Sequence, residues 1–287
     1  MSSPTHRHVL GGSDDVRRQS LATQAGLLEQ RLGGDVWPGA TLAALSTMAY
    51  DSATTRAALD PRDPAILIEL ERCACAAAGA FLAAVLPGTE PVEGPGPGRR
   101  RVQIDRARFD RRKLRGQVHW RTGMLAAAAA RHHEAIATLA SIRPDDLQGL
   151  SPAAPPWIAS EAAALAAVFR RDGDAAERLV AALREADPDR VDPISRNYVL
   201  DVVAAELELG FRVVDRDAAG VERALGQALE RHHHYYGHGD AKGSVEGQLA
   251  LAPLALACLA RDLGTATTVT SDYIPDWIVA RRPPGPA

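Results

Sequence analysis

Aromatic residues, cysteines and long apolar runs are all scarce in this sequence. Phenylalanine, tryptophan and tyrosine together make up 5% of the 287 residues, whereas alanine, leucine and charged residues are abundant. Such a composition favours helices packed on helices, because small alanines allow close approach. The longest apolar run, residues 249–260, has 12 residues, and crossing a bilayer takes about 20. We therefore expect no membrane-spanning helix and no membrane partner.

Cysteine content and net charge are also low. Cys73, Cys75 and Cys258 are odd in number and lie in apolar surroundings, so we interpret them as small buried hydrophobic residues in a reducing compartment rather than a disulfide framework. Residues 1–15 have neither the apolar core nor the cleavage pattern of a secretory signal. The formal net charge of −3 is too small to indicate a class of partner. We expect a soluble, cytoplasmic protein.

No arrangement typical of catalysis occurs. Residues 132–134 place two histidines beside a glutamate, but no serine or cysteine nucleophile accompanies them. The alternating glycines of residues 94–98 follow no recognisable strand and open no clear helix, which argues against a nucleotide-binding loop. We predict no catalytic residue, no cofactor and no enzymatic activity.

Residues 1–86 are predicted to contain three helices. Apolar periodicity indicates a helix that follows Asp14 and Asp15 and runs to about residue 32, and further helices over residues 38–59 and 65–86, with Pro38 suited to the first turn of the second. The middle of the third helix is apolar on all sides, so we expect it to be buried.

Residues 87–101 are rich in glycine and proline and are predicted to be a loop. Beyond them, Val102 and Ile104 alternate with polar residues, which suggests a short strand or extended strap. Residues 102–287 are predicted to form helical pairs with a buried helix near the end. We expect residues 1–287 to form a single helical domain.

A weak internal repeat follows from residue 117 onward. Acidic residues followed by alanine occur at Glu134, Asp174 and Asp217, at intervals of 40 and 43 residues, each between an apolar helix end and an amphipathic helix. This period suits stacked antiparallel helix pairs. Chance similarity among alanine-rich helices explains it about equally well.

The chain ends with an unusually apolar helix. Residues 249–263 are apolar on almost every face, so other helices must surround this segment. Pro253 must either kink the helix or open its main portion, and Gly264 suits the left-handed position after it. The β-branched residues 265–270 should be extended, and Pro275 suits the start of a short final helix.

Residues 99–121 are strongly basic, with ten lysines and arginines against two aspartates. Aromatic residues that could stack on bases are nearly absent there, with only Phe109 and Trp120, so we do not expect nucleic-acid binding. Pairing with acidic helices inside the fold is the preferred interpretation, and a patch facing an acidic partner is the alternative.

A histidine cluster is the strongest candidate for a metal site. His234 and His238, four residues apart, would share one face of a helix, with Asp240 just beyond. However, flanking glycines indicate that the helix is ending, and no glutamate general base is interleaved. His232, Tyr235 and Tyr236 form a stripe that suits packing or surface recognition. We therefore predict no metal.

Three segments near the C-terminus carry a family resemblance: LALAPLALACLARD at 249–262, SDYIP at 271–275 and ALERHHHYYG at 228–237. They resemble the closing apolar helix, the acidic-aromatic turn and the histidine-aromatic helix of the immunity protein 49 family, whose members are bacterial polymorphic-toxin immunity proteins. The specific similarity covers about the last 50 residues. Thr270 departs from the pattern, because an acidic residue is expected there.

The resemblance implies an immunity protein that binds a cognate toxin domain and blocks its active or substrate site. The toxin is then the partner, and no cofactor is needed. The candidate contact residues are His233, Tyr235, Tyr236, Asp272 and Tyr273. For Tyr273 we prefer a structural role, as a side chain packed under the final turn.

The predicted fold is all-α, with antiparallel helical pairs stacked as a solenoid or bundle and at most one minor strand or hairpin. Two other functions remain open. One is a helical-repeat scaffold or regulatory module unrelated to toxins. The other is a metal-dependent enzyme that uses the histidine cluster of residues 232–238.

Overall fold

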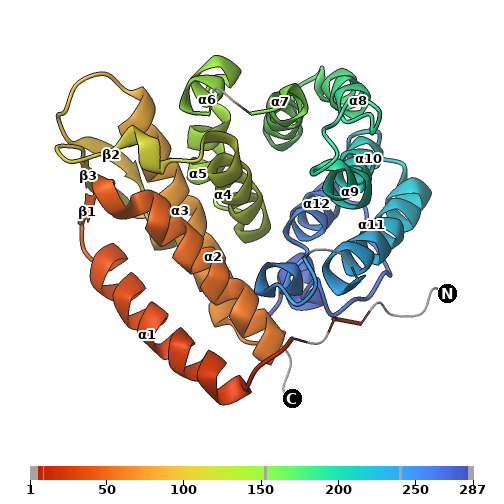
Figure 1. The fold of residues 1–287 in the computed structure, drawn as a ribbon, viewed down its shortest axis with the longest axis horizontal. Coiled ribbons are helices and arrows are strands. Elements are labelled where there is room, and N and C mark those ends of the chain that lie inside the picture. Colours follow the sequence, from red (N-terminus) through yellow and green to blue (C-terminus); the bar gives the residue numbers. More distant parts are fainter. Residues whose placement is uncertain (1–5, 9, 152–153, 239–240, 284–287) are drawn as a thin grey trace.

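The computed structural model describes residues 6–8, 10–151, 154–238 and 241–283 of the chain. Figure 1 shows a mostly helical molecule in which the chain passes around an arc from α1 to α11 before its C-terminal part returns to the N-terminal helices. The predicted mostly α-helical fold is confirmed. Its α-helices are α1 (Asp14–Leu32), α2 (Leu42–Leu59), α3 (Ala65–Val85), α4 (Gly116–Ala130), α5 (His133–Ala140), α6 (Pro144–Leu150), α7 (Pro156–Arg170), α8 (Ala175–Glu185), α9 (Arg196–Tyr198), α10 (Ala204–Val214), α11 (Ala218–His238), α12 (Leu251–Asp262) and α13 (Asp276–Ala280).

Shorter helical turns join several of these helices. A five-residue π-helical segment, η4 (Val199–Val203), connects α9 directly to α10. The 3-10 turns are η1 (Gly39–Thr41), η2 (Pro97–Arg99), η3 (Arg111–Lys113) and η5 (Val245–Gln248).

The N-terminal helices agree with their periodicity. Helix α1 ends at Leu32 as predicted but already includes Asp14 and Asp15, and Ser13 caps it by accepting a hydrogen bond from the N–H of Asp15. Helix α3 ends one residue before the predicted boundary. Its alanine-rich middle is buried, and both of its cysteines are free and inaccessible, as is Cys258 in α12.

A small three-stranded sheet takes its strand β2 from the predicted loop at residues 87–101. Strand β3 (Arg101–Asp105) pairs antiparallel with β2 (Val92–Pro95) and parallel with β1 (Val36–Pro38), in the order β1-β3-β2. The expected strand around Val102 and Ile104 is confirmed, but the structure has one strand more than a hairpin. Because β1 takes residues 36–38, helix α2 begins at Leu42 and not at Pro38.

Glycine makes this sheet possible where the sequence suggested only a loop. A side chain at Gly94 would place its Cβ 2.6 Å from Cδ1 of Ile104, and one at Gly96 would meet Val102. The strand can lie over these two buried side chains only because residues 94 and 96 lack a Cβ.

The repeated segments fold into three helix pairs, α4–α5, α7–α8 and α10–α11, each joined by a short turn. At every turn an arginine takes the left-handed conformation: Arg131 at φ 54°, Arg171 at φ 63° and Arg216 at φ 57°. The following N–H returns to a carbonyl five residues earlier, with distances of 2.8, 2.9 and 3.1 Å. This is the hydrogen-bond pattern of a Schellman helix end. The first helix of each pair therefore ends with the same backbone conformation and hydrogen bond.

Helix α12 lies at the centre of the C-terminal half and contacts α4, α10, α11 and α13. Every residue from Leu251 to Ala260 is buried, as its all-round apolarity predicts. Pro253 lies in the first turn, so it opens the helix without a kink. Gly264 takes φ +91° after the helix, also as predicted.

Candidate functional site

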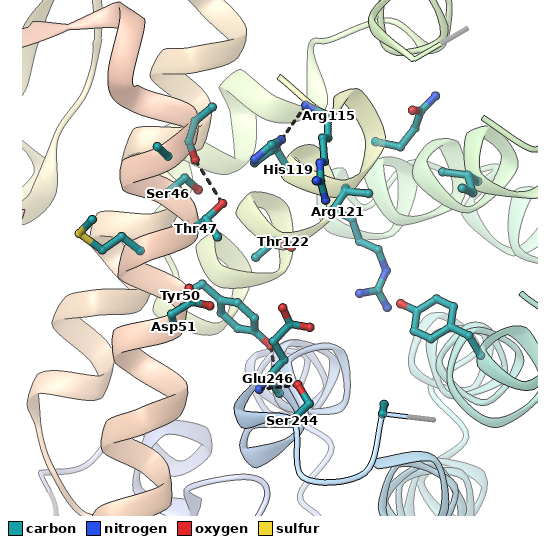
Figure 2. A pocket seen from close by; sticks show the side chains of 18 of the residues that line it. Ser46, Thr47, Tyr50, Asp51, Arg115, His119, Arg121, Thr122, Ser244 and Glu246 are labelled. Atoms are coloured by element: carbon teal, nitrogen blue, oxygen red, sulfur yellow. Dashed lines mark hydrogen bonds between the residues drawn. The ribbon is translucent and has the colours of Figure 1, made fainter. Parts of the chain in front are cut away.

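A cleft of about 1100 Å³ separates the N-terminal helices from the later helix pairs. Its walls come from α2, α4, α7, α9 and α11 and from the segment of residues 241–246. Figure 2 shows α2 on one side of this cleft, α4 behind it and the segment carrying Ser244 and Glu246 below. The cleft thus combines segments from both ends of the chain.

One arginine of α4 is held between two buried carboxylates. Nε of Arg121 lies 2.6 Å from Oε1 of Glu161 on α7, and its NH2 group pairs with Glu206 on α10. Burial raises the pKa of Glu206 to about 7 in spite of the adjacent guanidinium. This Arg121 triad connects three helices and carries one excess negative charge when both carboxylates are ionised.

An acidic pole lies at the α2 end of the cleft and is formed by Asp51 and Glu246. The Tyr50 side chain extends from α2 toward Glu246 (Figure 2). The Tyr50 hydroxyl donates to the backbone carbonyl of Glu246 at 3.4 Å. Burial, and next the charge of Glu246, raise the pKa of Asp51 to about 6. Within the part of the chain that the structure describes, neither carboxylate has an ion pair or a side-chain hydrogen bond.

A basic rim lies at the other end, where α4 begins. Lys113 and Arg115 are exposed there, and the backbone N–H of Arg115 donates to Nδ1 of His119 at 2.8 Å. That bond uses Nδ1 as an acceptor, so the neutral ring carries its proton on Nε2. Burial lowers the pKa of His119. Figure 2 places Arg115 and His119 well away from Tyr50, Asp51 and Glu246, so the two charge signs are segregated.

Aromatic side chains line the wall formed by α7, α9 and α11. The Tyr198 ring lies between Trp157 and Tyr235, at centroid distances of 6.4 and 5.5 Å. Tyr236 packs edge-on against Tyr235 at 5.0 Å. A Cβ on Gly247 would lie 2.3 Å from Cγ of Tyr236, so the ring packs directly over that glycine.

Two of the five predicted contact residues, Tyr235 and Tyr236, line the cleft. His233, Asp272 and Tyr273 belong to a different place, where the N-terminal segment meets the C-terminal turn. The Tyr273 hydroxyl accepts from the backbone N–H of His8 at 2.9 Å and lies 2.8 Å from Nδ1 of His233.

Tyr273 is 0% exposed, which argues against the prediction that it is a contact residue. Its ring contacts His232 and His233 of α11 and His8 of the N-terminal segment, which agrees with the preferred structural role. Asp272 is exposed and lies 3.2 Å from His6. His233 is partly buried by its contact with Tyr273.

The histidine cluster is divided: the rings of His233 and His234 lie 5.6 and 5.8 Å from that of His238, but His232 does not join them. His232 points into the interior, with Nε2 2.9 Å from the carbonyl of Gly247, and burial lowers its pKa to about 4. His234 instead pairs with Asp201 at 2.9 Å, and Asp240 lies outside the described residues. Over the described ranges, no three His, Cys, Asp or Glu side chains are arranged to hold a metal ion.

The basic segment pairs within the fold only in part, because Lys113 and Arg115 near its end are exposed and have no ion pair among the described residues. Arg101 lies 2.9 Å from Glu93 on the neighbouring strand. Arg106 is buried and donates to the carbonyls of Leu86 and Pro87 at the end of α3. Arg121 enters the triad.

Sequence reasoning missed the residues that give the cleft its charge, above all Asp51, Glu161, Glu206 and Glu246. Two of them carried a usable signal: Glu161 and Glu206 are isolated acids on otherwise apolar helix faces. A charge in such a position is buried only with a partner. Asp51 and Glu246 carried none, since exposed-looking acids are common on helices and turns.

The match to known families covers most of the chain. The family model described as Immunity protein 49 matches residues 42–278, which include α2, α4, α7, α9 and α11 of the cleft wall. The chain belongs to the Immunity protein 49 family. No curated protein matches it, and no solved structure does.

The family description is that of an immunity protein and not of an enzyme. In the described part of the chain, no helix is both long enough and apolar enough to cross a bilayer.

Proposed function

We propose that this protein is a bacterial, cytoplasmic immunity protein that binds a cognate toxin domain and neutralises it by blocking its active or substrate site. Membership of the Immunity protein 49 family is the observation that carries this proposal. The family description implies a toxin partner in general terms, and the direct block of a site on that toxin is our addition.

The architecture supports this mode of action because a preformed surface loses little entropy on binding. Helices that line the cleft are tied together through buried groups, such as Arg121 with Glu161 and Glu206. The buried apolar side chains form one contiguous cluster from Leu28 to Ile278. We accordingly propose that residues 1–287 act as one domain.

Four of the predicted contact residues remain candidates for the toxin-facing surface. Tyr235 and Tyr236 lie in the cleft wall, and aromatic anchors of this kind often supply much of a binding energy. His233 and Asp272 lie on the adjacent surface formed with the N-terminal segment.

Co-expression tests the proposal directly. The C-terminal toxin domain encoded by the neighbouring gene is expressed in a sensitive bacterium with and without this protein, and growth is measured. Growth restored by the protein, together with a stable complex of the two purified chains, supports direct neutralisation. Growth that stays arrested although both proteins are soluble contradicts it.

A further inference from the structure

The acidic pole of the cleft lacks the counter-charge that the rest of the cleft possesses. Glu161 and Glu206 share Arg121, whereas Asp51 and Glu246 face the cleft without a cation among the described residues. Two neighbouring unpaired carboxylates in a partly enclosed site repel each other and favour a cationic ligand.

Aromatic rings accompany these carboxylates. Tyr50 on α2 and Tyr236 on α11 line the same cleft, and Tyr50 is hydrogen-bonded to the backbone of Glu246. The faces of aromatic rings attract ammonium and guanidinium groups, and guanidinium groups also stack on them. Acids beside tyrosine rings therefore form a site for a lysine or arginine side chain.

Two residues with buried donor groups lie elsewhere in the cleft wall and can report on its occupancy. Gln117 is 2% exposed and Trp157 is 6% exposed, and both line the cleft. In the described structure, the Nε2 group of Gln117 and the indole Nε1 of Trp157 have no acceptor. Both nitrogen atoms are enclosed by protein, so their signals respond to movement of the cleft wall around a ligand.

We propose that the cleft receives a segment of the partner protein that carries a lysine or arginine, with its cationic group between Asp51 and Glu246. Lys113 and Arg115 repel a cation from the opposite rim, so the charge arrangement also sets the direction of the segment. This inference rests on the proposed function for the identity of the partner, the toxin, but not for the chemistry of the site.

A minimal probe tests the site without the toxin. Uniformly ¹⁵N-labelled protein is titrated with N-acetyl-arginine methylamide, and N-acetyl-citrulline methylamide serves as the neutral analogue of nearly equal shape. The Trp157 indole and Gln117 side-chain amide signals report binding, each identified by its absence in Trp157→Phe or Gln117→Leu. Saturable shifts with the arginine compound, at least tenfold weaker with citrulline, are expected.

The matched variants are D51N/E246Q and E177Q/E230Q. Both pairs remove two negative charges, but Glu177 and Glu230 are exposed residues outside the cleft. The first pair should lose at least tenfold in affinity for the arginine compound, and the second should bind like the wild type. The single variant E246Q, at an exposed position, gives the same readout if the double variant folds poorly. Shifts that do not saturate, that are equal for citrulline, or that persist in E246Q overturn the proposal.

Binding of the purified toxin domain separates the two proposals. A wild-type protein that neither binds the toxin nor restores growth contradicts the proposed function, while the arginine titration still decides the cleft. A wild-type protein that binds, with D51N/E246Q binding within twofold of it, leaves the function intact and overturns the role of the cleft. A toxin affinity that falls at least tenfold in D51N/E246Q but not in E177Q/E230Q supports both proposals.

Discussion

Nε of Arg131 lies 2.9 Å from Oδ2 of Asp262, so the turn between α4 and α5 is joined to the end of α12. The same guanidinium donates to the carbonyls of Ile278 and Val279, at 2.9 and 3.0 Å. Arg131 therefore has two roles: its backbone ends α4 in the left-handed conformation, and its side chain holds α12 and α13 against that turn. The left-handed backbone costs about 1 kcal/mol or more, and these contacts offset that cost.

Replacing Arg131 with alanine should lower the free energy of unfolding by about 3 kcal/mol, because the substitution leaves Asp262 and the C-terminal carbonyls without their donor. Chemical denaturation measures the loss. Arg171→Ala is the matched control, since Arg171 has the same backbone conformation but an exposed side chain. The control should change stability by less than about 1 kcal/mol. Equal losses in both variants would assign the effect to the backbone alone.

Replacing Tyr273 with phenylalanine should release the N-terminal segment. The hydroxyl binds the backbone N–H of His8 and faces Nδ1 of His233 from a fully buried position. Its removal should cost about 1–2 kcal/mol, with faster amide hydrogen exchange at His8. Tyr198→Phe provides the comparison, because no hydrogen bond of the Tyr198 hydroxyl is formed among the described residues. Unchanged exchange at His8 in the Tyr273 variant would contradict this role.

The contribution of Asp51 to stability should fall as pH rises from about 4 to about 6, while the lowered pKa of His232, about 4, acts in the opposite direction. The folded protein keeps a proton on Asp51 up to a pKa of about 6, whereas the ordinary value is 3.8, so the folded state binds more protons in this interval. The raised pKa of Glu206, to about 7, acts in the same direction and extends the decline toward neutral pH. Ionised Asp51 should therefore destabilise the fold at pH 8.

Asp51→Asn measures this contribution. The substitution should raise the free energy of unfolding at pH 8 by about 1 kcal/mol, after allowance for the partial exposure of Asp51, and should leave it unchanged at pH 4. Glu230→Gln, on the exposed face of α11, should show no such pH dependence. A variant that is equally stabilised at both pH values would show that the effect does not come from ionisation.

Adding a methyl group at Gly247 should displace the Tyr236 ring from the cleft wall. The new Cβ would lie 2.3 Å from Cγ of Tyr236, a distance that forces movement near the base of that side chain. Overpacking of this kind costs about 1–3 kcal/mol, and toxin affinity should fall if the wall contributes to binding. Gly226→Ala, in an open position on α11, should instead stabilise the helix by about 0.5–1 kcal/mol. Full toxin affinity in Gly247→Ala would remove Tyr236 from the interface.

Local patterns predicted the helices well because a helix is decided by neighbours three and four residues away. The end of α1, the burial of α12 and the left-handed Gly264 all follow from periodicity and capping preferences. The sheet was only partly predictable. Pairing of residues 36–38 with residues 103–105 depends on contacts across more than sixty positions, and no local signal distinguishes β1 from a helix start.

The amino-acid sequence by itself determined the helical class of this protein, its apolar terminal helix and the family resemblance, because each depends on the spacing of residues that are close together in the chain. Only the tertiary structure decided that Asp51 and Glu246 face one cleft, that Arg121 lies between Glu161 and Glu206, and that Tyr273 is buried. These arrangements bring together residues 40 to 265 positions apart. Their geometry is set by how whole helices pack, and no pattern within a single helix contains that information.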